Sequence, residues 1–130
     1  MSRMLAVSLL QQQSAGDRIK GVSWTERLSQ PDDQVIGVLI QTLNYDPTVN
    51  VRLAALDALM KFGDRPEIQR MFLESLKKQT SPLLQLALVD VVTELKVADA
   101  ARAFKELLKE TKLNPTVKDR VTERLPQLSR

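Results

Sequence analysis

The sequence predicts an all-α protein, a right-handed α-α solenoid of eight helices arranged as four pairs. Three observations favour this fold. Prolines stand where helices would begin, apolar residues recur at spacings of three and four, and one motif returns after multiples of 34 residues. The 130-residue chain is 43% hydrophobic and has a mean hydropathy of −0.19, which is typical of a folded globular protein.

Proline marks most of the expected helix starts. A proline fits the first helical turn because its missing N–H has no partner there, and a neighbouring Asp, Ser or Asn can cap the free amides. Ser14, with Asp17 three residues later, gives a further start without a proline. Pro126 is instead expected to end the last helix. The five prolines at expected starts are Pro31, Pro47, Pro66, Pro82 and Pro115.

The apolar spacing between these signals predicts the extent of each helix. Short connections of roughly 2 to 5 residues favour antiparallel hairpins of consecutive helices. The helix at 82–95 is apolar on nearly every side, as an internal repeat requires, whereas the last helix has one apolar stripe and resembles a polar C-terminal cap. The expected helices cover residues 3–13, 16–28, 32–45, 47–62, 66–79, 82–95, 99–112 and 115–125.

A repeated motif divides the chain into similar parts. The segment NPTVKDRV at 114–121 matches DPTVNVRL at 46–53, so Arg52 and Arg120 are 68 residues apart, which is twice 34. Arg18 lies 34 residues before Arg52. We therefore expect one domain, residues 1–130, made of four helix pairs. The pairs are expected at about 1–30, 31–63, 64–96 and 97–130.

The stretch DPTVNVRLAALDAL at 46–59 has the clearest family resemblance. It resembles the second-helix signature of HEAT repeat proteins, in which Asp-Pro is followed by Val-Arg and then by Ala-Ala and Ala-Leu. The resemblance implies a solenoid whose second helices build a concave surface that binds a protein partner. The positions that match the repeat motif are Asp46, Pro47, Val51, Arg52 and Ala55.

The resemblance also implies a ladder of contacts between the turn aspartates and the helix arginines of adjacent repeats. The first and last pairs keep the arginine but have Gln12 or Asn114 in the place of the aspartate. In the third pair, Gln79 and Gln85 replace both charged residues. The ladder is therefore not expected to be continuous.

A narrower resemblance involves the opening MLAVSLLQQQSAGDRIKGVSW together with 46–59. These segments are similar to the soluble C-terminal part of certain bacterial membrane proteins. Those proteins carry an anti-sigma-factor-type zinc finger, then one membrane helix, then HEAT repeats. The similarity implies a sensing or protein-binding domain that lies on the far side of the membrane from the finger.

The composition excludes several kinds of chemistry. The chain has no cysteine and no histidine, which excludes Cys/His zinc sites, haem attachment, Ser-His-Asp triads and Cys-His dyads. Asp32 and Asp33 are explained by helix-start capping. Asp57 and Asp90 would lie about 10 Å apart on successive second helices, where two carboxylates could act together but solvated helix faces are commoner. We predict no catalytic residue, no cofactor, no metal and no enzymatic activity.

The first helix is unusually apolar for the end of a repeat array. No stretch approaches the roughly 18 to 20 uninterrupted apolar residues of a membrane span, so we expect no membrane insertion by this segment. The outer face of this helix is instead expected to contact a second copy of the chain or an upstream segment. Its apolar residues are Met4, Leu5, Val7, Leu9 and Leu10.

The leading functional prediction is a protein-interaction, scaffold or sensor module that binds a protein or peptide on the concave face of the solenoid. The exposed candidates on that face mix both signs of charge, which suits a polar peptide or a partner helix. A solvated repeat surface with no binding role is the alternative explanation of the same residues. The candidates are Arg18, Asn50, Asp57, Lys61, Gln85, Asp90 and Glu94.

Nucleic-acid binding is the alternative function. The chain has a net charge of +3, and the charge is uneven: residues 1–64 carry 6 basic and 7 acidic side chains, and residues 65–130 carry 13 and 9. Two basic groups could face phosphates, although interleaved glutamates also suit an ordinary solvated surface. The basic residues are Arg65, Arg70, Lys77 and Lys78 in one group, and Arg102, Lys105, Lys109 and Lys112 in the other.

Overall fold

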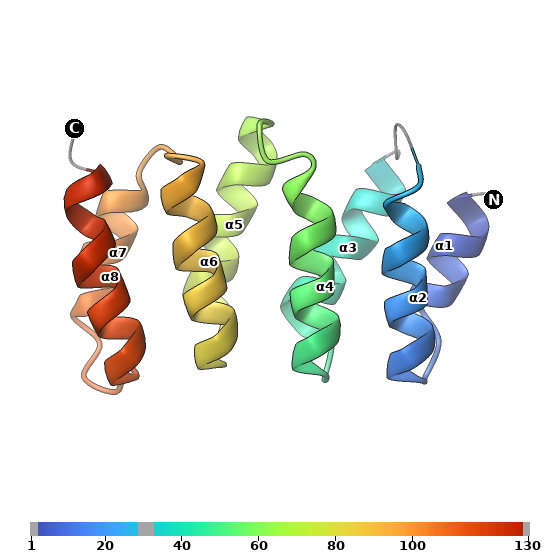
Figure 1. The fold of residues 1–130 in the computed structure, drawn as a ribbon, viewed down its shortest axis with the longest axis horizontal. Helices are drawn as coiled ribbons and strands as arrows, with labels where there is room; N and C mark the ends of the chain where they lie inside the picture. The colour runs from blue at the N-terminus through green and yellow to red at the C-terminus, as the bar shows by residue number, and fades with distance from the viewer. Residues whose placement is uncertain (1–2, 29–32, 129–130) are drawn as a thin grey trace. The chain divides into compact units, whose positions relative to one another are not determined.

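The computed structural model describes residues 3–28 and 33–128, and within these ranges it has eight α-helices and no β-strand (Figure 1). The predicted all-α class is therefore confirmed. The chain divides into two compact units, Met1–Lys61 and Phe62–Arg130, and each unit contains four of the helices.

The first unit consists of two helix pairs that lie side by side. Its helices are α1 (Arg3–Leu10), α2 (Ala15–Thr25), α3 (Asp33–Tyr45) and α4 (Val49–Met60). Helix α1 packs on α2 and α3 packs on α4, while α1 also contacts α3 and α2 contacts α4 (Figure 1). The unit therefore has a first-helix layer, α1 and α3, and a second-helix layer, α2 and α4.

Small residues allow the helices of this unit to pack closely. A Cβ atom added to Gly21 of α2 would lie 2.6 Å from the backbone nitrogen of Leu10, so α1 and α2 touch at this glycine. Ala55 and Ala58 of α4 are buried, which explains why the sequence places its smallest side chains inside this helix. The largest fully buried side chains of the unit are Val35, Leu39, Leu43, Val51, Leu56 and Leu59.

The second unit repeats this arrangement. Its helices are α5 (Pro66–Lys78), α6 (Pro82–Glu94), α7 (Ala100–Leu108) and α8 (Pro115–Leu128). The same four kinds of contact recur, with α5 on α6, α7 on α8, α5 beside α7 and α6 beside α8. Phe72 and Phe104 have no exposed surface and form the centre of the core of this unit.

Several helix starts agree with the sequence. Pro66, Pro82 and Pro115 are each the first residue of their helix. Ser14 is the N-cap of α2, and its hydroxyl accepts a hydrogen bond from the backbone N–H of Asp17. Pro47 differs, because the N-cap of α4 is Thr48 and the proline precedes it. The predicted starts at Pro31 and Asp32 lie outside the described residues.

The helix ends required more correction. Pro126 does not stop α8, which continues to Leu128. A proline removes one backbone hydrogen bond from the ladder of a helix, and in this last turn the helix tolerates the loss. Helix α7 begins at Ala100, after Asp99 turns the chain with a φ of 69°, and it ends at Leu108 rather than at residue 112.

The helix predicted at 82–95 is also less enclosed than its composition indicated. Leu84, Leu88 and Val92 are fully buried, but Leu83 is 59% exposed. An apolar composition all round does not enclose this side of α6. Helix α8 agrees better with its pattern, since Val117 and Val121 are buried while Leu125 is half-buried.

Candidate functional site

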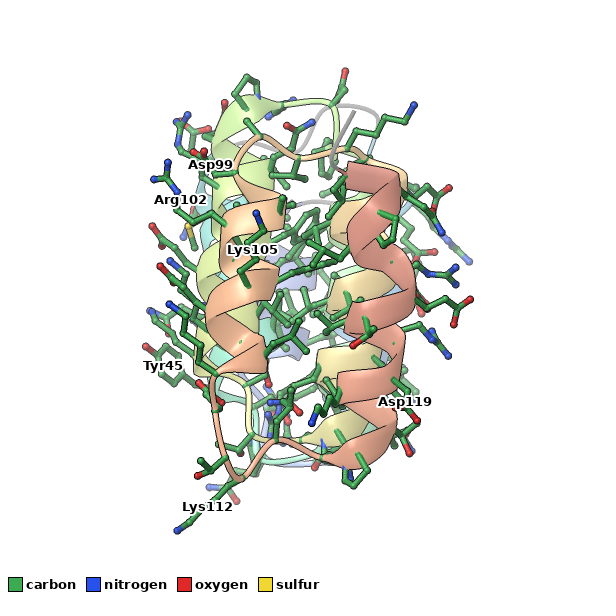
Figure 2. All side chains as sticks on the ribbon, turned by 90° about the vertical axis from the view of Figure 1, so that its left-hand side faces the viewer. Tyr45, Asp99, Arg102, Lys105, Lys112 and Asp119 are labelled. Carbon is green, nitrogen blue, oxygen red and sulfur yellow. The ribbon has the colours of Figure 1, made fainter. Side chains whose placement is uncertain are left out.

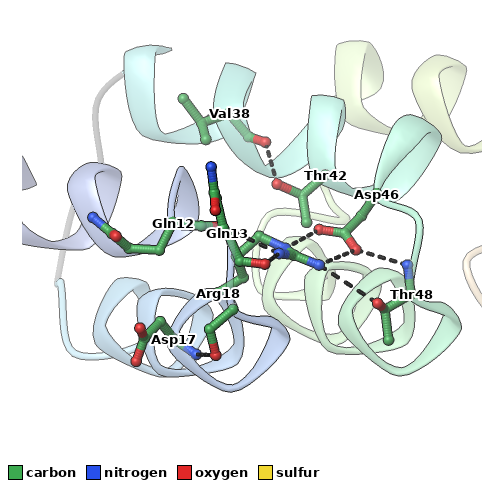
Figure 3. Close-up of polar contacts among 9 residues, drawn as sticks. Gln12, Gln13, Asp17, Arg18, Val38, Thr42, Asp46 and Thr48 are labelled. Carbon is green, nitrogen blue, oxygen red and sulfur yellow. Dashed lines mark hydrogen bonds and ion pairs between the residues drawn. The ribbon is translucent and has the colours of Figure 1, made fainter.

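A buried ion pair joins the two helix pairs of the first unit (Figure 3). Nε of Arg18 on α2 donates to Oδ2 of Asp46 over 2.6 Å, and Nη2 donates to Oδ1 over 3.1 Å. Arg18 is 9% exposed and Asp46 is 8% exposed, so the pair lies away from solvent. The two parallel hydrogen bonds give this contact the bidentate geometry in which arginine–carboxylate pairs are strongest.

The remaining polar atoms of this pair bind the backbone of both turns. Nη1 of Arg18 donates to the carbonyl oxygens of Gln12 and Gln13, which lie in the turn between α1 and α2. Oδ1 of Asp46 accepts a hydrogen bond from the backbone N–H of Thr48 over 2.9 Å. The pair therefore fixes the α1–α2 turn against the α3–α4 turn.

The second unit has the same polar positions with neutral side chains. Nε2 of Gln85 donates to the carbonyl oxygen of Gln79, six residues earlier, as Arg18 donates to the carbonyl oxygen of Gln12. Oδ1 of Asn114 accepts from the backbone N–H of Thr116, two residues later, as Asp46 does from Thr48. Gln85 and Asn114 therefore take the places of the arginine and the aspartate.

This replacement coincides with an open pocket of about 630 Å³ in the second unit. Gln79, Gln85 and Asn114 line the pocket together with Pro82 and Pro115, the first residues of α6 and α8. The charged side chains that line it are Lys77, Lys78, Glu110 and Lys112. A charged pair joins the turns of the first unit, whereas the second unit leaves space for solvent beside the same positions.

The residues predicted to bind a partner are not all accessible. Asn50, Asp57, Lys61 and Glu94 are exposed, as expected. Arg18 and Gln85 are more than nine-tenths buried, so the expectation that they are exposed was wrong. Both side chains turn back to carbonyl groups of their own inter-helix turn, which a surface pattern along one helix does not reveal.

Asp90 is partly exposed, and its charge is already paired. Arg120 of α8 donates to Oδ2 of Asp90 over 2.5 Å, and Arg124 approaches Oδ1 at 3.4 Å. The hydrogen bond and the charge of Asp90 raise the pKa of Arg120 above its ordinary value. Asp57 belongs to the first unit and Asp90 to the second, so the two predicted carboxylates are described only separately.

The basic residues of the second unit alternate with acidic ones. A depression between α5 and α7 is lined by Arg70, Lys77 and Arg102, and equally by Glu74, Asp99 and Glu106. Figure 2 shows Asp99 and Arg102 near one end of α7, with Lys105 on the side of the helix that faces the viewer. This part of the surface is therefore of mixed sign, which does not favour phosphate binding over ordinary solvation.

The described residues contain no group of three or more His, Cys, Asp and Glu side chains that could hold a metal ion. In the same ranges, no helix has both the length and the apolar character needed to cross a bilayer. The polar groups with built geometry are thus the turn network of Arg18 and Asp46 and its neutral counterpart in the second unit.

Comparisons with known proteins give no family assignment: no protein-family model matches the chain, and no curated protein matches it at a significant level.

Proposed function

We propose that the chain is a non-enzymatic protein-interaction module in which the second-helix layer, α2 with α4 and α6 with α8, binds a protein or peptide partner. The observation that supports it most directly is the pairing of these helices within each unit. Side-by-side helices present a broad polar surface, and solenoids bind partners through surfaces of this kind. The exposed residues available on or beside α4 and α6 are Asn50, Asp57, Lys61 and Glu94.

The proposal includes a continuous solenoid of four HEAT-like pairs. The shared hydrogen-bond pattern of Arg18 and Gln85, and of Asp46 and Asn114, supports an internal repeat. A repeat unit of one helix pair buries its apolar face by stacking on its neighbours, which favours extension of the same stacking along the chain. A role as the regulatory domain of an anti-sigma-factor-like membrane protein rests only on the sequence resemblance.

Charge reversal on the two layers tests the proposed surface. The variant Asp57→Lys/Glu94→Lys changes exposed residues of α4 and α6, and the matched variant Glu67→Lys/Glu106→Lys changes exposed residues of α5 and α7 by the same charge. Each protein is immobilised and exposed to a nuclease-treated extract of the source cell, and the retained proteins are quantified by mass spectrometry.

The proposal expects at least one partner that the original chain and the α5/α7 variant retain equally and the α4/α6 variant loses. Partners that all three proteins retain equally would contradict a role for the second-helix layer. Retention that depends on omitting the nuclease would instead support the nucleic-acid alternative.

A further inference from the structure

Gly37 lies in the interior of α3, and nothing inside its own unit explains it. A Cβ atom added to this residue meets no other atom within 4 Å, whereas the same atom on Gly21 would clash with the backbone of α1. A glycine in a helix interior lowers the folding equilibrium constant about fivefold relative to alanine. The packing within unit 1 thus requires a glycine at position 21 and only loses stability from the glycine at position 37.

Gly37 also lies in an open groove of about 620 Å³. The α3 side of the groove includes Gln34, Val38 and Gln41, and the end of α1 contributes Leu10. Tyr45, at the end of α3, is 66% exposed and points away from its helix in Figure 2. A missing side chain inside a groove allows another backbone to approach α3 closely, because the distance between packed helices depends on the side chains at their contact.

We propose that the occupant of this groove is a second copy of the chain, with the two α3 helices crossing antiparallel at Gly37. A two-fold contact of this kind places residues at equal distances from Gly37 opposite each other. Asp33 lies four residues before Gly37 and Gln41 lies four residues after it, and both line the groove. The carboxylate of Asp33 then meets the carboxamide N–H of Gln41 of the second copy, twice in each dimer.

The charges of the groove favour a second copy over a charged partner. Its acidic residues are Asp33 and Asp46, and Asp46 is already paired with Arg18. No Lys or Arg lines the groove, so an acidic partner would find no counter-charge. In the antiparallel dimer the two Asp33 residues are separated by eight residues of helix, about 12 Å along the axis, which limits their repulsion.

Sedimentation equilibrium of the full chain over a wide concentration range tests this contact. The original chain should form a dimer. Gly37→Ala should raise the melting temperature by a few degrees and weaken the dimer about tenfold or more, because the added methyl groups separate the helices. This variant removes a helix-breaking residue at an open position, so loss of the dimer cannot be attributed to failure to fold.

Charge variants test the register of the contact. Gln41→Lys places an ammonium group opposite Asp33 of the second copy and should strengthen the dimer, whereas Gln41→Glu places two carboxylates together and should weaken it. Ser23→Glu, at an exposed position of α2, introduces the same charge away from the groove and should leave the dimer unchanged. A chain that stays monomeric at every concentration overturns the proposal, as does a dimer that is insensitive to Gly37→Ala and Gln41→Glu.

Discussion

The guanidinium of Arg18 lies alongside the carboxylate of Asp46, with Nε 2.6 Å from Oδ2 and Nη2 3.1 Å from Oδ1. The arginine belongs to the first helix pair and the aspartate to the turn of the second pair. The turn carbonyls of Gln12 and Gln13 and the backbone N–H of Thr48 satisfy the remaining sides of both groups. Breaking such a pair leaves one buried charge without its partner, which costs far more than the pair itself contributes.

The substitution Asp46→Asn is expected to lower the free energy of unfolding by about 3 kcal/mol, since it strands the buried charge of Arg18. Asparagine supports the same turn, as Asn114 does in the second unit, so the loss comes from the missing charge. Urea unfolding at neutral pH measures the effect. Arg18→Met/Asp46→Asn serves as the control and should lose less than the sum of its two single variants; a loss below about 1 kcal/mol for Asp46→Asn would contradict the assignment.

The equivalence of the two units predicts that the ion pair can be transferred to the second one. Gln85→Arg alone should destabilise the protein, because it places a charge at a buried position. Adding Asn114→Asp should recover most of that loss, with a coupling energy of about 1–3 kcal/mol in a double-mutant cycle. Additive effects of the two substitutions would show that positions 85 and 114 do not correspond to positions 18 and 46.

Two glycines in the first unit should respond oppositely to alanine. Gly21→Ala should destabilise the protein by about 1–3 kcal/mol, since the new methyl group would lie 2.6 Å from the nitrogen of Leu10. Gly37→Ala should stabilise the isolated chain by roughly 0.5–1 kcal/mol, because its position is open. Thermal unfolding at a concentration low enough to exclude association distinguishes these signs, and a stabilising Gly21→Ala would disprove the close α1–α2 contact.

The exposed contact between Asp90 and Arg120 should matter much less than the buried pair. Both groups are partly solvated, with side-chain exposures of 43% and 31%, so salt screens their attraction. Asp90→Asn should lower the melting temperature slightly at low ionic strength and not at all in 1 M sodium chloride. An equal loss under both conditions would mean that Asp90 acts through packing or hydrogen bonding alone.

Much of the fold was predictable because its signals are local. The proline at the start of α5, α6 and α8 and the Ser14 cap of α2 each depend on a few neighbouring residues. Pro126 was misjudged because the local rule for proline does not include the tolerance of a last helical turn.

The candidate surface was harder to predict, because accessibility depends on contacts across the fold. Arg18 and Gln85 looked like exposed polar residues, yet both are buried. Their partners lie five or six residues earlier or, for Arg18, in a turn 28 residues away. The match between 46–53 and 114–121 did place Asp46 and Asn114 in register, and their shared turn geometry agrees with it.

Spin-label distances between α2 and α8 test most directly whether the four helix pairs form one continuous row. The chain has no cysteine, so Lys20→Cys/Thr122→Cys introduces the only labelling sites, at exposed positions 102 residues apart, which is three repeats of 34. Three steps between neighbouring second helices predict a single narrow distance of about 24–30 Å, extended by the reach of the labels. A broad distribution, or a mean well outside that range, would show that the second helices do not share one face and would contradict the proposed binding surface.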